Sequence, residues 1–257
     1  MDKKIRYIGK IGQVVLWAIV AVAMLSILIL LFAVQKKHIP SPADEFDPQA
    51  YIQKCAKDAG REAADIMLPQ GGFISPKNFK MYQNIEVEYL CQNIGYFKSC
   101  INQHPLLIEE MKMEILNYTR PVIINCLNTL KIELDNRKYN STMHNPKINI
   151  SLAPKKIFII IETGMTLEKN SIVRKFNYIE AQIDYPIYDL AIVANDIASQ
   201  EANYCYFEYI GYSLLYPEFD IRKFTLSDST RIYTIKHKSS NKVMNVAIRG
   251  CAIPPGI

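Results

Sequence analysis

Histidine, the side chain most often used for acid–base and metal chemistry near neutral pH, is scarce in this chain. The four histidines are His38, His104, His144 and His237. No two are four residues apart, and the sequence contains neither an H-E-x-x-H metal motif nor a G-x-S-x-G nucleophile motif. We therefore interpret each histidine as structural or solvated, and we predict no catalytic residue, no metal site and no cofactor.

Paired carboxylates are the second pattern that suggests chemistry. Glu86 and Glu88 are two residues apart in a strand-like segment and therefore project from the same face, and Glu109 and Glu110 are adjacent. A glycosidase uses two carboxylates about 5–10 Å apart across a cleft. Spacing alone does not create such a cleft, so we interpret Glu86 and Glu88 as a solvated strand face. A membrane-tethered hydrolase of envelope polymers remains an alternative function.

Aromatic side chains are densest between Tyr204 and Phe219. Tyrosine combines a rigid apolar ring with a polar tip, which is typical of binding surfaces and of sugar stacking. The candidate interaction surface comprises Tyr206, Tyr209, Tyr212 and Tyr216. Support of the core is one alternative, which Cys205 within this segment favours, and glycan binding is another.

All six cysteines follow residue 34, and an even number in an extracytoplasmic domain is typical of disulfides. Buried free thiols are the alternative. No two cysteines have C-x-x-C spacing, so neither a zinc ribbon nor a thioredoxin-like site is indicated. The pairs that we prefer are Cys91–Cys100, closing a hairpin, Cys55–Cys126, joining two helices, and Cys205–Cys251, tying the last strand to the aromatic segment. Candidate glycosylation sites at N-x-S/T sequons are Asn117, Asn140 and Asn149.

These residues must be positioned by the elements around them, and the longest candidate element lies near the start of the chain. Residues 11–34 carry no charged side chain. This uncharged stretch is long enough for a transmembrane helix. The basic residues before it favour a cytoplasmic N-terminus and an extracytoplasmic C-terminal domain. A cleaved signal peptide, with Ala21-Val22-Ala23 as its cleavage pattern, is the alternative.

The remaining chain is close to neutral. Residues 1–34 contain four basic residues and one acidic residue, which leaves +2 of the total charge of +5 for residues 35–257. This balance does not indicate a nucleic-acid partner.

The predicted organisation is a cytoplasmic tail, a transmembrane helix, a linker and two subdomains. A helix is expected to begin at Asp47-Pro48, where an acceptor side chain precedes a proline. Alternation predicts a strand over 84–91, and Pro121 is expected to kink or interrupt a helix that begins near Pro105. The fold class is α+β: the transmembrane helix, a small helical/hairpin subdomain, then an antiparallel sheet with a covering helix. The ranges are 1–10 (tail), 11–34 (transmembrane helix), 35–46 (linker), 47–135 (helical/hairpin subdomain) and 146–257 (antiparallel α+β subdomain).

The N-terminal segment resembles a known signal. Lys10-Ile11-Gly12-Gln13 before a hydrophobic stretch resembles the archaeal type IV pilin-like (class III) signal. The resemblance implies cleavage between Gly12 and Gln13 and packing of the hydrophobic segment in a filament core. Residues 10–130 are also similar to uncharacterised single-pass archaeal membrane proteins. The residues that carry this second resemblance are Gly12-Gln13, Cys55, Gln70-Gly71-Gly72, Pro121 and Cys126.

Together these patterns predict a non-enzymatic, membrane-anchored surface protein with a structural or adhesive role. Its expected partners are the lipid bilayer and either another protein or further copies of itself, as in a pilin-like filament. A ligand-binding sensor ectodomain is a further alternative.

Overall fold

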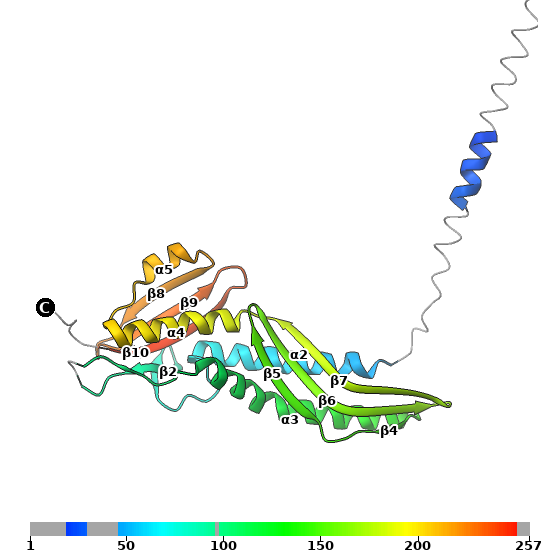
Figure 1. The fold of residues 1–257 in the computed structure, drawn as a ribbon, viewed down its shortest axis with the longest axis horizontal. Helices are drawn as coiled ribbons and strands as arrows, with labels where there is room; N and C mark the ends of the chain where they lie inside the picture. Colours follow the sequence, from blue (N-terminus) through cyan, green and yellow to red (C-terminus); the bar gives the residue numbers. More distant parts are fainter. Residues whose placement is uncertain (1–18, 30–45, 96–97, 251–257) are drawn as a thin grey trace, which may run out of the picture. The chain divides into compact units, whose positions relative to one another are not determined.

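A computed structural model describes residues 19–29, 46–95 and 98–250 (Figure 1). The chain divides into two compact units, residues 1–46 and 47–257, and each is considered by itself. In the first unit, residues 19–29 form an α-helix. The helices described in the second unit are α2 (Pro48–Met67), the short 3-10 helix η1 (Leu68–Gln70), α3 (Leu107–Asn136), α4 (Ile187–Tyr204) and α5 (Tyr209–Leu215).

The strands of the second unit form two sheets. The six-stranded sheet has the order β1-β2-β10-β9-β8, with β3 also paired to β2. Its strands are β1 (Phe79–Tyr82), β2 (Ile85–Gln92), β3 (Ile101–Asn102), β8 (Phe219–Thr225), β9 (Arg231–His237) and β10 (Lys242–Arg249). Only the β2–β10 pair is parallel among the described pairs of this sheet.

The four-stranded sheet is centred on β6. Its strands are β4 (Asn140–Thr142), β5 (Lys147–Ala153), β6 (Lys156–Lys169) and β7 (Ile172–Asp184). β5 and β4 pair with successive parts of β6, and β7 pairs with β6 along most of its length. Helices α2 and α3 pack against this sheet, and α4, which follows β7, packs against both sheets (Figure 1).

Helix α2 begins and packs as local chemistry predicts. The Asp47 side chain accepts hydrogen bonds from the backbone N–H groups of Gln49 and Ala50, at 2.9 and 3.2 Å, which satisfies two donors of the first turn. Gly60 faces the sheet, where an added Cβ would lie 2.6 Å from Ile183 Cδ1 and 2.7 Å from Ile159 Cδ1. The small residue therefore permits the close approach of this helix to β6 and β7.

Helix α3 is not interrupted at Pro121, where we expected either a kink or an interruption. It runs for 30 residues with Pro121 inside it. A buried stripe that includes Met111, Ile115, Ile123 and Leu130 continues on both sides of the proline, and this packing offsets the single backbone hydrogen bond that proline removes.

Two of the predicted disulfides are confirmed. Cys55–Cys126 joins α2 to α3, and Cys91–Cys100 closes the segment between β2 and β3. Cys205 is also disulfide-bonded, and its predicted partner, Cys251, lies outside the described residues.

The predicted fold class is wrong in two respects. First, no helix among the described residues is both long and apolar enough to cross a membrane. Within the expected span, the described residues 19–29 are helical. Residues 11–18 and 30–34 lie outside the described part of the chain.

Second, residues 47–250 do not separate into a helical/hairpin subdomain and one antiparallel sheet. The fold is α+β with two sheets, and β2, from the first half, pairs in parallel with β10 near the end of the chain. Parallel partners can lie far apart in sequence, and nothing in the local pattern of either strand identifies the other.

Candidate functional site

Helix α5 is held in place beside the six-stranded sheet by a few side-chain contacts on its inner face. The Tyr212 hydroxyl donates to Asp196 Oδ2 of α4 at 2.9 Å. The Tyr212 ring contacts the fully buried Phe207 ring, with centroids 5.3 Å apart, and Phe207 meets Tyr233 of β9 edge-on at 5.8 Å. A helix of seven residues is marginal alone, so these contacts hold it in place.

The N-terminal end of α5 is capped by Glu208. Its side chain accepts from the backbone N–H groups of Ile210 and Gly211, at 3.2 and 3.3 Å. It also accepts from the Tyr206 hydroxyl, and this hydrogen bond, the largest of several causes, lowers the pKa of Glu208. Glu208 therefore stays ionised, as a cap near the positive end of a helix should be.

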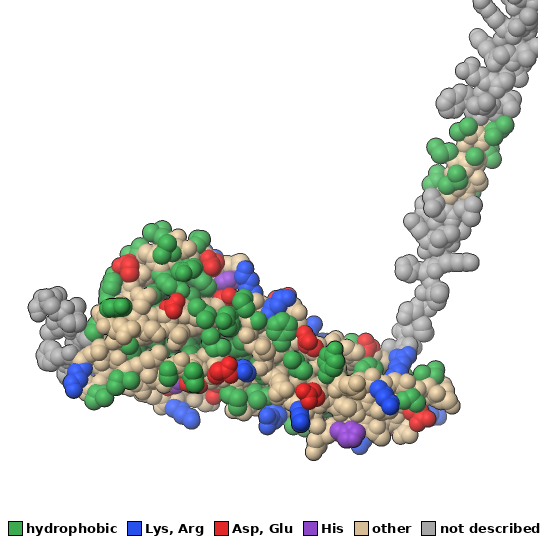
Figure 2. Space-filling view, in the orientation of Figure 1, with side chains coloured by type: hydrophobic (Ala, Val, Ile, Leu, Met, Phe, Trp, Pro, Cys, Tyr) green, Lys and Arg blue, Asp and Glu red, His purple; other side chains and the backbone are tan. Residues whose placement is uncertain are grey.

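The outer side of α5 is apolar and exposed. Leu214 is 78% exposed and Leu215 77%, and none of the residues of the helix is buried. Ile210, 59% exposed, lies one turn before Leu214 on the same face. Exposed rings of Tyr206 and Tyr216 flank these residues. We call these five residues the α5 surface, and Figure 2 shows hydrophobic side chains gathered over this part of the molecule.

Charges of both signs surround the α5 surface. Glu208 and Glu218 are acidic, whereas Lys223 Nζ lies 5.2 Å from the Tyr206 ring centroid and 5.1 Å from that of Tyr209. A cation over an aromatic face orders the ring as well as the lysine. The α5 surface is thus an ordered apolar patch with a mixed polar rim, which is the anatomy of a protein interface.

The structure divides the four predicted tyrosines between two roles. Tyr206 and Tyr216 are exposed members of the α5 surface, whereas Tyr209 and Tyr212 are partly buried, and Tyr212 fixes the helix from below. Burial is the main cause that raises the pKa of Tyr212, and the hydrogen bond to Asp196 raises it further, so its hydroxyl remains a donor. Sequence reasoning missed Ile210, Leu214 and Leu215, although the i, i+4 spacing of Ile210 and Leu214 was a usable signal.

A second candidate site surrounds His104, just before α3. Its Nδ1 lies 2.5 Å from Glu110 Oε2, and its Nε2 lies 3.5 Å from Glu88 Oε1. Glu88 also accepts from the backbone N–H groups of Lys77 and Asn78, at 2.6 and 3.1 Å. The groups line an open cavity of about 410 Å³, which we call the His104 pocket.

Both ring nitrogens of His104 therefore face carboxylates. Burial acts to lower the pKa of His104, but the hydrogen bonds with Glu88 and Glu110, together with their charges, outweigh it and raise the pKa. An imidazolium with both N–H groups engaged is a clamp between β2 and α3. The prediction that Glu88 belongs to a solvated face is wrong, because Glu88 is 3% exposed.

A third polar cluster is enclosed between α4 and β9. The fully buried Glu201 carboxylate accepts hydrogen bonds from Arg231 and from the Tyr233 hydroxyl. Arg231 also donates to the Cys205 carbonyl at 2.7 Å. Every member of this cluster meets a polar partner, and it encloses no cavity that the structure describes, so we interpret it as structural.

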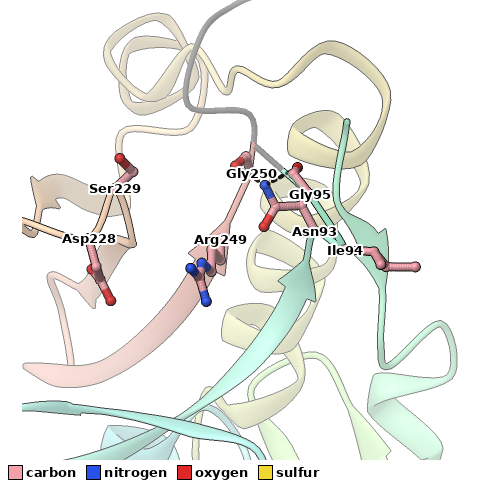
Figure 3. A pocket seen from close by; sticks show the side chains of 7 residues that line it. All are labelled: Asn93, Ile94, Gly95, Asp228, Ser229, Arg249 and Gly250. Carbon is pink, nitrogen blue, oxygen red and sulfur yellow. Dashed lines mark hydrogen bonds between the residues drawn. The ribbon is translucent and has the colours of Figure 1, made fainter. Parts of the chain in front are cut away.

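A smaller pocket, of about 170 Å³, lies where the parallel strands β2 and β10 end (Figure 3). The Asn93 side-chain amide donates to the carbonyl oxygens of Gly95 and Gly250, at 2.9 and 2.8 Å, as the dashed lines show. On the other side, Asp228 accepts from Lys80 at 2.6 Å. These bonds pin two strand ends together, so the pocket is a structural junction.

The remaining predicted residues lie apart from these sites. Asn117, Asn140 and Asn149 are all exposed, on α3, β4 and β5. Gly12 and Gln13 lie outside the described residues. In the part of the chain that the structure describes, no group of three or more His, Cys, Asp or Glu side chains is arranged to hold a metal ion.

Comparisons with protein-family models, with curated proteins and with solved structures found no match to this chain. The fold itself defines an α+β domain with two sheets. The resemblance to archaeal pilin-like proteins gains no support from these comparisons.

Proposed function

We propose that residues 47–250 form an extracytoplasmic binding domain that docks a protein partner through the α5 surface. The observation that carries this proposal is the exposure of Leu214 and Leu215, at 78% and 77%, on a helix that is anchored from below. A folded domain gains nothing in its own stability from displaying two adjacent leucines on an ordered helix. Contiguous exposed apolar side chains of this kind mark interaction sites.

The chemistry around the α5 surface favours a protein over a lipid partner. A surface that binds anionic lipid carries an excess of Lys and Arg, whereas Glu208 and Glu218 stand beside the basic residues here. Tyrosine at the border of an apolar patch is typical of the residues that dominate protein–protein binding energy.

The disulfides support an extracytoplasmic location. Cys55–Cys126 and Cys91–Cys100 would be reduced by the thiol pools of an ordinary cytosol. Non-reducing peptide mapping of protein from its native cells should recover both linked peptides. Recovery of four free thiols would contradict the location.

The docking proposal is tested with variants of the full-length protein. Leu214→Glu/Leu215→Glu places charge on the α5 surface, and Ile132→Glu is the matched control, because Ile132 is 63% exposed on α3. Quantitative mass spectrometry of gently isolated protein should find one co-isolated protein at similar amounts with wild type and Ile132→Glu, and should lose it with the α5 variant. An unchanged set of co-isolated proteins in all three samples would contradict docking through α5.

Hydrolysis of an envelope polymer is the second candidate, and the His104 pocket is the observation that favours it. The pocket brings His104, Glu88 and Glu110 together in a cavity, which is the first requirement of acid–base chemistry. Release of reducing ends from envelope polysaccharide by wild type, lost in Glu110→Gln, would support it. Wild-type protein that releases none removes this candidate.

A further inference from the structure

A groove in the four-stranded-sheet region lies between α3 and the segment 143–149, which comprises the connector of β4 and β5 and the first residues of β5. It consists of two adjoining cavities of about 480 and 170 Å³ that share Ile124, Asn145 and Pro146. Arg120, Ile124 and Lys131 belong to one stripe of α3, because the positions lie at i, i+4 and i+11. We call this feature the α3 groove.

A β-bulge fixes the wall of the α3 groove opposite the helix. The pairing of β6 and β7 shifts register between Glu162 and Met165, where Gly164 has φ +53°. The backbone N–H of His144 donates to the Thr163 carbonyl at 3.2 Å, and His144 Nδ1 lies 3.2 Å from the Gly164 carbonyl oxygen. The connector is thus tied to the bulge, and bulges commonly re-aim side chains at binding sites.

The charged side chains that line the groove are all cationic. Arg120, Lys131 and Lys147 line it, and no Asp or Glu is among the described residues that do. None of the three cations forms an ion pair within the described part of the chain. Glu162 lies opposite Lys147 in the β5–β6 pairing, but no acidic side chain is among the described residues that line the groove, so the groove itself attracts an anionic ligand.

A buried hydroxyl provides independent support for a ligand. Thr163, 1% exposed, lines the smaller cavity, and its Oγ1 has no hydrogen-bond partner among the described residues. A buried polar atom without a partner costs stability, so such atoms are rare in folded proteins. A ligand that supplies the missing partner would recover that cost.

We propose that the α3 groove binds a linear anionic polysaccharide. Arg120 and Lys131 are 11 positions apart on the helix, about 16 Å, which suits repeated acidic groups better than one small anion. The amides of Asn128, Asn145 and Asn149 suit sugar hydroxyls. No Phe, Tyr or Trp is among the described lining residues, so the stacking platform of single-stranded nucleic-acid sites is missing.

The binding test uses glycan-free, full-length protein, because Asn149 of the groove lies in a sequon. Titration calorimetry with polygalacturonate oligomers should show binding that weakens with salt, and neutral dextran oligomers should not bind. Arg120→Gln/Lys131→Gln should weaken binding about tenfold or more. The matched control Arg222→Gln/Lys238→Gln, on exposed cations of the other sheet, should leave it unchanged.

Thr163→Val separates a ligand role from a structural role. The variant removes the hydroxyl and keeps the shape, so binding should weaken about fivefold while the unliganded protein is equally or more stable. The proposal is overturned if acidic and neutral oligomers bind alike, if the double variant binds as well as wild type, or if single-stranded DNA binds more tightly than the oligomers. Loss of thermal stability in Thr163→Val would likewise assign the hydroxyl to the fold.

Discussion

At the scale of single residues, His104 couples the stability of the domain to pH. Its folded-state pKa is raised above the ordinary value of about 6.5, so its clamp stabilises the domain fully below that value. The contribution is lost as pH rises through the folded-state pKa. We expect His104→Gln to lower the free energy of unfolding at pH 5.5 by about 1–3 kcal/mol, and by much less at pH 9.

Urea denaturation of both proteins at the two pH values measures this difference. Glu109→Gln is a suitable control, because Glu109 lines the same pocket but pairs with Lys112 at 2.7 Å. If the loss of unfolding free energy in His104→Gln is larger at pH 9 than at pH 5.5, the raised pKa of His104 is contradicted.

Glu201 provides a second residue-scale prediction. Its carboxylate is fully buried and bonded to Arg231 and Tyr233, so Glu201→Gln removes the negative charge from an enclosed ion pair. We expect a loss of about 3–5 kcal/mol in the free energy of unfolding. The control is Glu133→Gln in the exposed Glu133–Arg137 pair, with an expected change of about 0.5 kcal/mol or less. Similar losses in the two variants, measured by chemical denaturation, would show that burial does not decide the effect.

Neither of these clusters could be predicted from the sequence. Alternation correctly predicts the strand that holds Glu88, but it does not show that both faces of β2 are covered from Val87 to Cys91. For Ile157–Ile161 the local pattern overstates burial instead of understating it. A continuous apolar run is typical of a strand buried on both faces, yet Phe158 and Ile160 are only partly buried. Which faces are covered depends on packing partners that lie far away in the chain.

At the scale of elements, Pro121 identifies a weak point in α3. Proline at this position leaves the carbonyl of Asn117 without its usual helical partner, and Pro121 itself is exposed. Pro121→Ala restores the missing N–H without creating a cavity. We expect the free energy of unfolding to rise by about 1–3 kcal/mol. A lower melting temperature for the variant would contradict this account of Pro121.

The two described disulfides should contribute unequally to stability. Cys55–Cys126 links residues 71 positions apart, and Cys91–Cys100 links residues 9 apart. The loss of chain entropy in the unfolded state corresponds to about 4 kcal/mol for the longer loop and about 2.5 kcal/mol for the shorter. Guanidinium denaturation of Cys55→Ala/Cys126→Ala and Cys91→Ala/Cys100→Ala compares them. A smaller loss for the longer loop would contradict this ranking.

Local chemistry explains which elements were predictable. The start of α2 follows from Asp47 and Pro48, and the end of η1, which continues α2, follows from Gly71 and Gly72, which have φ values of +82° and +96°. Helix α5 was missed because seven residues are too few for a clear period, and its tyrosines also suit a strand.

At the scale of the whole molecule, the parallel pairing of β2 with β10 makes residues 47–250 one domain rather than two. The last strand that the structure describes completes a sheet that began about 160 residues earlier. The α5 surface and the α3 groove belong to the two different sheets of this domain. We therefore expect the α5 and α3-groove variants to lose protein docking and polysaccharide binding independently of each other.

The central claim is that the α5 surface contacts another protein, and photo-cross-linking from that surface tests it most directly. A photoreactive amino acid would replace Leu214 in the full-length protein in its native cells, and Ile132 in a matched control, because both side chains are exposed. We predict a discrete adduct with one protein, another copy of this chain included, from position 214 and none from position 132. Adducts with lipid alone, or the same adducts from both positions, would contradict the claim.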